Sequence, residues 1–166
     1  MSPTGELLAV SERQALEFFA LGLRDVSESS VDQEELLYNA SVLAHYALVS
    51  TSRTVELSTP ATLGDVFDHF VADESAPRDS LRMEMAAAQC LLLAGFFEDQ
   101  MRRRHNIRWY AQLGASFFSQ AASQSTSAKR ARLLEALAHD FERWRRRHSN
   151  LSRELRAQAK MLGRVM

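Results

Sequence analysis

The chain has 166 residues, and a domain of this length buries about two thirds of the surface that its unfolded form exposes, so it needs no disulfide or metal for stability. Apolar residues make up 46% and charged residues 25% of the sequence, which excludes a wholly disordered chain. The net charge of −1 conceals an asymmetry: residues 1–79 contain fourteen acidic and four basic side chains, and residues 129–166 contain four acidic and eleven basic ones. This separation indicates a surface for a nucleic acid or an acidic partner, attraction between the two ends within the fold or across a dimer, or solvated helix faces that differ in sign.

The composition favours helices over strands. Three prolines and six glycines leave little turn punctuation for a β fold. Ser11 and Ser30 are each followed three residues later by a glutamine, which is a capping pattern at helix N-termini, so we predict amphipathic helices that begin at these serines. Thr59 before Pro60 predicts a further short helix, because proline in the first helical position loses no hydrogen bond, and Pro77 ends it.

The middle of the chain predicts a helical hairpin. A nearly uninterrupted apolar run over residues 85–97 predicts a buried helix over residues 81–101, because apolar side chains cover all of its sides. Arginines follow in a charged turn, and Asn106 is placed to cap the next helix. The polar run over residues 123–127 separates that helix from a C-terminal one.

These signals predict an all-α fold, a single-domain bundle of six or seven helices with a long C-terminal helix. We expect residues 1–148 to form the bundle and residues 149–166 a basic helical extension. Cys90 is the single cysteine, so no intrachain disulfide can form and a reducing compartment is expected. The sequence shows neither a secretory signal nor an apolar run long enough for a bilayer, and it therefore predicts a cytoplasmic protein without a membrane partner.

Four short motifs follow one another in the central hairpin: Leu92-Leu93-Ala94-Gly95-Phe96-Phe97, Arg102-Arg103-Arg104, Trp109-Tyr110 and Leu113-Gly114. Together they resemble a group of bacterial all-helical proteins of unknown function. Residues 37–46 are similar to an upstream helix of that group. The chain departs from the group's pattern at Trp109, where the group has a tyrosine, and at Phe117-Phe118, where it has a small residue and a tyrosine. The resemblance implies an all-helical bacterial protein and supplies no catalytic residues.

Gly95 and Gly114 lie within helical patterns, where each glycine costs up to about 1 kcal/mol relative to alanine. One explanation is a close approach of the central helix to the next one, in which small residues from both helices meet. The other is a ligand that lies against bare backbone, which defines a candidate pocket between these glycines, Trp109 and Tyr110.

The sequence lacks the residue constellations that common chemistries require. None of the five histidines follows a glutamate by three residues, as a di-iron bundle needs, and no two histidines are four residues apart. Cys90 lies in the most apolar helix, where the thiol acts as a small hydrophobe. Glycine-rich phosphate loops and nucleophile elbows are absent. We therefore predict no catalytic, metal or cofactor-binding residues.

The C-terminal segment carries a heptad seam, whose positions alternate in steps of three and four from Leu134 to Leu162. This spacing is typical of coiled coils and indicates self-association. The candidate oligomer contacts are Trp144, His148, Leu151, Leu155 and Leu162. Packing of the seam on the protein's own body explains the pattern equally well, and we favour it for the part through Trp144.

The sequence therefore predicts a non-enzymatic helical interaction or adaptor module that self-associates into a homodimer or a larger oligomer. The first alternative is a nucleic-acid-binding protein, because a basic helix alone gives sequence-independent affinity for polyanions. Its candidate contacts are Arg143, Arg145, Arg146, Arg147, Arg153, Arg156 and Lys160. The second alternative is an enzyme or small-molecule sensor with a pocket near Gly95 and Gly114.

Overall fold

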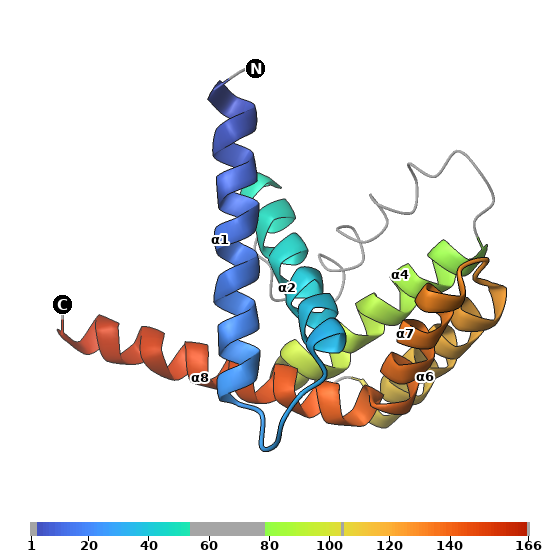
Figure 1. Ribbon diagram of the computed structural model, residues 1–166. Coiled ribbons are helices and arrows are strands. Elements are labelled where there is room, and N and C mark those ends of the chain that lie inside the picture. Colours follow the sequence, from blue (N-terminus) through green and yellow to red (C-terminus); the bar gives the residue numbers. More distant parts are fainter. Residues whose placement is uncertain (1–2, 54–78, 104, 166) are drawn as a thin grey trace. The chain divides into compact units, whose positions relative to one another are not determined.

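The computed structural model describes residues 3–53, 79–103 and 105–165, and within them the side chains of residues 12–48, 80–103 and 105–160. These ranges contain helices and no strands, which confirms the predicted all-α class. Figure 1 shows the elements, which are α1 (Pro3–Asp25), α2 (Gln33–Arg53), α4 (Asp79–Leu91), the π-helix η1 (Leu92–Phe96), α5 (Glu98–Met101), α6 (Ile107–Gln124), α7 (Ala128–His139) and α8 (Phe141–Val165). The short helix expected after Thr59 and the break at Pro77 lie outside the described residues.

The chain is organised as two compact units, Met1–Leu57 (unit 1) and Ser58–Met166 (unit 2). The expected boundary between a bundle of residues 1–148 and an extension of residues 149–166 falls inside α8, which continues through that point as one helix. No helix in the described part of the chain is long and apolar enough to cross a membrane.

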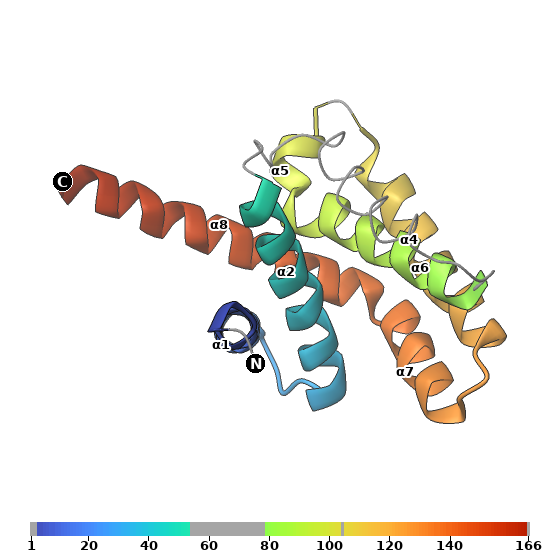
Figure 2. The same cartoon turned by 90° about the horizontal axis from the view of Figure 1, so that it is seen from above.

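Unit 1 is a helical hairpin in which α1 and α2 pack on each other; Figure 2 views α1 end-on. The prediction that the first helix begins at Ser11 is wrong, because α1 begins at Pro3, where proline is favoured in the first helical position. The second helix begins at Gln33 instead of Ser30. Its cap is Asp32, whose Oδ1 accepts a hydrogen bond from the Glu35 backbone N–H at 3.0 Å.

The central helix of unit 2 is buried where the sequence predicts it, but it is not a regular α-helix throughout. From α4 through η1 to α5 the chain keeps one course, and the backbone N–H of Phe97 donates to the Leu92 carbonyl oxygen at 2.9 Å, the five-residue step of a π-helix. The extra residue changes which side chains face which neighbours beyond Leu92. Fully or almost fully buried side chains in this helix are Ala87, Ala88, Cys90, Leu91, Leu92, Leu93, Ala94, Phe97 and Met101.

The other helices of unit 2 surround this central element. α6 packs along α4, α7 packs on α6, and α8 packs mainly on η1. The predicted cap at Asn106 is confirmed, since its side chain accepts a hydrogen bond from the Trp109 backbone N–H at 3.2 Å. Ser127 caps α7 in the same way through the N–H of Arg130.

The heptad seam at the C-terminus is divided between two helices, α7 and α8, whereas a single C-terminal helix was expected from the sequence. Asp140 leaves helical geometry, with φ of −96° and ψ of 16°, and separates α7 from α8. The backbone remains satisfied at this bend, because the N–H of Asp140 donates to Ala136 and the N–H of Trp144 donates to the Asp140 carbonyl oxygen. The chain can therefore change direction here at little cost in hydrogen bonds.

Candidate functional site

A buried polar network joins the end of the central helix to α8. Glu98 is 8% exposed, and its carboxylate binds the guanidinium of Arg145 and accepts a hydrogen bond from the Ser149 hydroxyl at 2.9 Å. Arg145 also donates to the Ala94 carbonyl oxygen at 3.0 Å and holds Glu142 through two hydrogen bonds of 2.6 and 2.8 Å. The network is satisfied on every side, as buried charges require.

Asp99 extends this network toward the C-terminal half of α8. Arg153 binds both Glu98, at 2.8 Å, and Asp99, at 3.1 and 3.2 Å, and Arg156 also binds Asp99. The hydrogen bonds from Arg153 and Arg156 lower the pKa of Asp99 to about 2. Burial raises the pKa of Glu98, but hydrogen bonds from Arg145 and Ser149 outweigh it, so that pKa also lies below its usual value. Both carboxylates are ionised near neutral pH.

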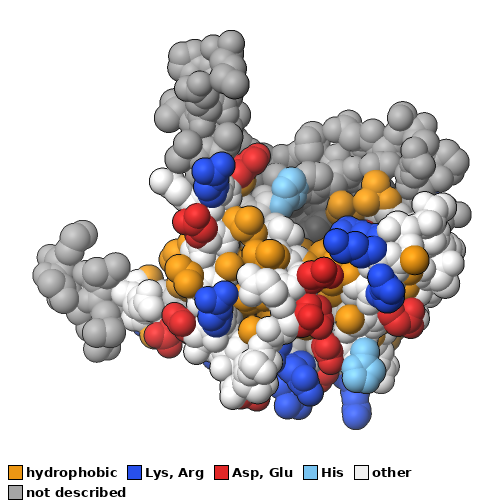
Figure 3. Space-filling model, viewed as in Figure 1, with side chains coloured by type: hydrophobic (Ala, Val, Ile, Leu, Met, Phe, Trp, Pro, Cys, Tyr) orange, Lys and Arg blue, Asp and Glu red, His pale blue; other side chains and the backbone are white. Residues whose placement is uncertain are grey.

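These ion pairs reduce the number of basic side chains on α8 that are available to bind a nucleic acid. Arg145, Arg153 and Arg156 bind the carboxylates of Glu98, Asp99 and Glu142, and Arg147 is 4% exposed, with its guanidinium 4.5 Å from the centre of the Trp144 ring. Exposed positions among the seven candidate nucleic-acid contacts are Arg143, Arg146, Arg153, Arg156 and Lys160. Where Figure 3 draws unit 2, acidic side chains lie next to basic ones.

The candidate oligomer contacts are mostly interior positions. Trp144 and Leu151 are 2% exposed and His148 is fully buried, whereas Leu155 is half-buried and the side chain of Leu162 lies outside the described residues. Burial lowers the pKa of His148 to about 3, so its imidazole is neutral. The seam from Trp144 to Leu151 therefore packs within this chain. This buried part extends past Trp144, the residue at which the sequence placed its end.

Both glycines of the central hairpin mark close packing. A β-carbon on Gly114 would lie 2.8 Å from that of Cys90 and would collide with the Phe141 ring, so the approach of α6 to the central helix is of the kind the sequence indicated. Gly95 instead faces α8: a β-carbon there would lie 2.9 Å from that of His148 and 3.0 Å from the Arg145 carbonyl oxygen. Protein atoms thus fill the space over both glycines, where the candidate ligand pocket was expected.

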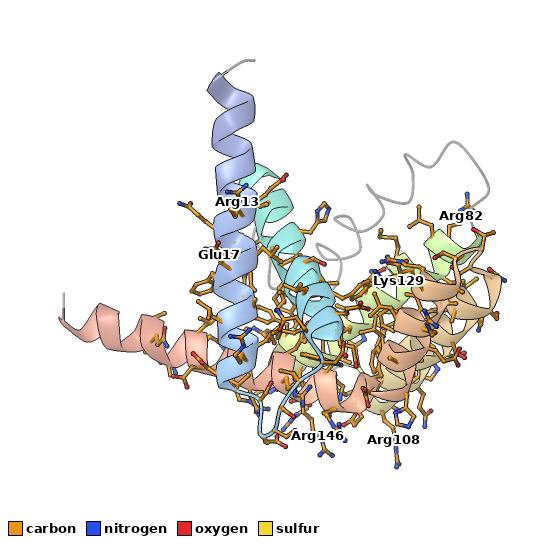
Figure 4. All side chains as sticks on the ribbon, viewed as in Figure 1. Arg13, Glu17, Arg82, Arg108, Lys129 and Arg146 are labelled. Atoms are coloured by element: carbon orange, nitrogen blue, oxygen red, sulfur yellow. The ribbon has the colours of Figure 1, made fainter. Side chains whose placement is uncertain are left out.

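A surface groove lies instead between α6 and the first turns of α8 and encloses about 590 Å³. Its lining residues are Ile107, Arg108, Ala111, Gln112, Ala115, Phe141, Glu142, Arg145 and Arg146. Arg108 and Arg146 stand on opposite banks, one on each helix, and Figure 4 shows both directed outward at the same edge of unit 2. This groove was not predicted from the sequence, where the one pattern that points to it is the spacing of four between Ile107, Ala111 and Ala115.

Trp109 lies beside Arg108 in the first turn of α6 and is 52% exposed, an unusual state for so large an apolar side chain. Its ring meets that of Tyr110 edge to face at 4.9 Å between centres, and Tyr110 in turn meets His105 at 5.9 Å. These edge-to-face contacts hold the indole in a defined position at the surface.

The described residues offer little for covalent or metal chemistry. They contain no group of three histidine, cysteine, aspartate or glutamate side chains that could hold a metal ion. Burial raises the pKa of the Cys90 thiol to about 12, which keeps it protonated and poorly nucleophilic. Comparison with protein-family models, with curated proteins and with solved structures gives no match for this chain.

Proposed function

We propose that this chain is a non-enzymatic adaptor module that self-associates and binds a protein partner through unit 2. The observation that carries the proposal is the exposed indole of Trp109, held at the surface by its contact with Tyr110. Tryptophan, tyrosine and arginine are the residues that most often dominate the binding energy of protein interfaces, which makes an exposed indole beside Arg108 and Tyr110 a candidate contact residue.

Two further observations support a protein partner over a nucleic acid. Arg145, Arg153 and Arg156 already bind carboxylates of the same chain, so fewer of the α8 cations can neutralise phosphates. In addition, the apolar residues that line the groove, such as Ile107 and Ala111, suit the side chains of a protein better than a phosphate backbone.

Because the heptad seam is buried, the self-association that the sequence indicated requires another contact surface. Because Trp144, His148 and Leu151 are buried, we assign the contact between copies to the exposed face of α6 around Trp109. Two copies related by a twofold axis would each bring the same face, so that each indole is covered by the partner.

Sedimentation of the full chain at high micromolar concentration tests this function. We expect a mass above that of the monomer, and we expect Trp109→Ser to shift the protein to the monomer. Gln120→Ser, which changes another exposed side chain of α6, should leave the mass unchanged. A monomeric full chain, or an oligomer that is indifferent to Trp109→Ser, would contradict the proposal.

A further inference from the structure

The groove between α6 and α8 has the shape of a seat for another helix. Ile107, Ala111 and Ala115 recur every four residues along one face of α6, so they form a strip about 12 Å long. Phe141 of α8, which is only 3% exposed, borders the strip. Small side chains along such a strip let a second helix approach closely, with its own side chains inserted between them. The lining includes exposed residues of both helices, Arg108, Gln112 and Arg146, so this groove opens to the surface.

The charged residues on the two sides of the groove favour a particular charge on the residues that flank the apolar face of that helix. Arg108 is exposed on the α6 bank and has no ion pair among the described residues. Arg146 on the α8 bank keeps 69% of its side chain exposed and makes one ion pair, with Glu142 at 3.4 Å. Cations on both banks are complementary to acidic residues on both edges of an inserted apolar face.

The acidic member of the groove does not cancel this preference. Glu142 receives two hydrogen bonds from Arg145, which are the main reason why its pKa lies below the usual value. Its two oxygens point to the guanidinium beneath the groove, and that guanidinium is in turn tied to Glu98. Glu142 keeps 51% of its side chain exposed, but three arginines line the same groove, so its net charge is positive, and Arg108 and Arg146 are the exposed cations.

We propose that this groove binds an acidic amphipathic helix of a partner protein. The apolar residues of that helix, at spacings of three and four, lie on Ile107, Ala111 and Ala115, and its glutamate or aspartate residues face Arg108 and Arg146. The inference rests on the proposed adaptor function, of which it names the partner class.

Synthetic peptides of eighteen residues provide the test. The first places leucine at helical spacing with glutamate on both flanks; the second has the same leucines with lysine flanks; the third keeps the glutamates and replaces the leucines by serine. Binding of each to the full chain is measured by fluorescence anisotropy. We expect the first alone to bind, with an affinity that falls as salt is added, because the flanking charges are screened.

Variants of the chain locate the site. Arg108→Glu with Arg146→Glu should weaken binding of the acidic peptide by about tenfold or more, since both bank charges become repulsive. Arg82→Glu with Lys129→Glu makes the same charge change at two exposed positions outside the groove and should have little effect. Ala111→Trp, which fills the strip, should abolish binding, and the melting curve of each variant verifies that it is folded.

Each outcome bears on a distinct claim. Equal binding of the lysine peptide would overturn the acidic partner while leaving an interaction groove in place. Equal effects of the two double charge reversals would overturn the groove as the site. Binding of single-stranded oligonucleotides that depends on Arg108 and Arg146, without binding of the acidic peptide, would replace the protein partner by a nucleic acid. The proposed self-association is tested independently, by the effect of Trp109→Ser on the mass of the protein in sedimentation.

Discussion

Gly95 and His148 lie so close that a β-carbon on the glycine would be 2.9 Å from the β-carbon of the histidine. One residue belongs to the π-helix and the other to the buried face of α8, and the Arg145 backbone borders the same point. The absence of a side chain at Gly95 is thus what allows α8 to reach Glu98 and to form the polar network described above.

Gly95→Ala should destabilise the protein by about 1–3 kcal/mol, because the methyl group would push against backbone that cannot move easily. Helix propensity alone gives the opposite sign, since alanine is favoured over glycine by up to about 1 kcal/mol. Chemical denaturation therefore decides between the two by the direction of the change. Gln100→Ala, an exposed change in α5, serves as the control and should be almost neutral.

Leu92→Ala should cost about 2–5 kcal/mol, because Leu92 is fully buried and its truncation leaves a cavity. The free energy of unfolding in urea measures the loss. A change below about 1 kcal/mol would mean that the core collapses around the site or that this helix is peripheral.

Truncation after Ser149 should lower the melting temperature. It removes the buried Leu151 together with Arg153 and Arg156, and so leaves Asp99 without its two arginine partners. Calorimetry of the truncated and intact chains gives the measurement. If residues 150–166 were an independent extension, the two melting temperatures would coincide.

Stability should fall as the pH drops below about 6.5, because of His148. Its pKa in the folded state is about 3, below the value of 6.5 in the unfolded chain, so between these values the unfolded state binds one more proton. The stabilisation is complete above pH 6.5 and is lost toward pH 3, with a slope of up to about 1.4 kcal/mol per pH unit. Denaturation between pH 7 and pH 5 should show this slope for the native protein and a smaller one for His148→Gln.

Cys90 should resist thiol reagents in the native protein. Burial raises the pKa of its thiol to about 12, so almost no thiolate exists at pH 8, and the side chain is 5% exposed. Its rate of reaction with an aromatic disulfide should rise steeply in denaturant. Rapid labelling without denaturant would show that the core around Cys90 and Gly114 opens.

Local signals in the sequence were sufficient for part of this structure. The cap at Asn106 and the buried position of Leu92 both follow from residues within a few turns, because capping and periodicity involve neighbours along one helix. One local signal was misleading, since the serine pattern at Ser11 predicted a helix start, whereas α1 begins at Pro3.

The path of the chain in space decided the rest. Glu98 meets Arg145 and Ser149, 47 and 51 residues further on, and no spacing in the sequence encodes such a pair. The bend at Asp140 and the five-residue step at Phe97 set where α8 crosses the central helix. As a result of this crossing, the heptad seam is buried at His148 and several arginines lie within reach of carboxylates. The groove beside Arg108 and Arg146 is left open at the surface. The sequence determined the all-helical class and the amphipathic faces, because these depend on local periodicity. Only the tertiary structure decided which faces are covered and which charges remain at the surface, because burial and ion pairing depend on residues distant along the chain.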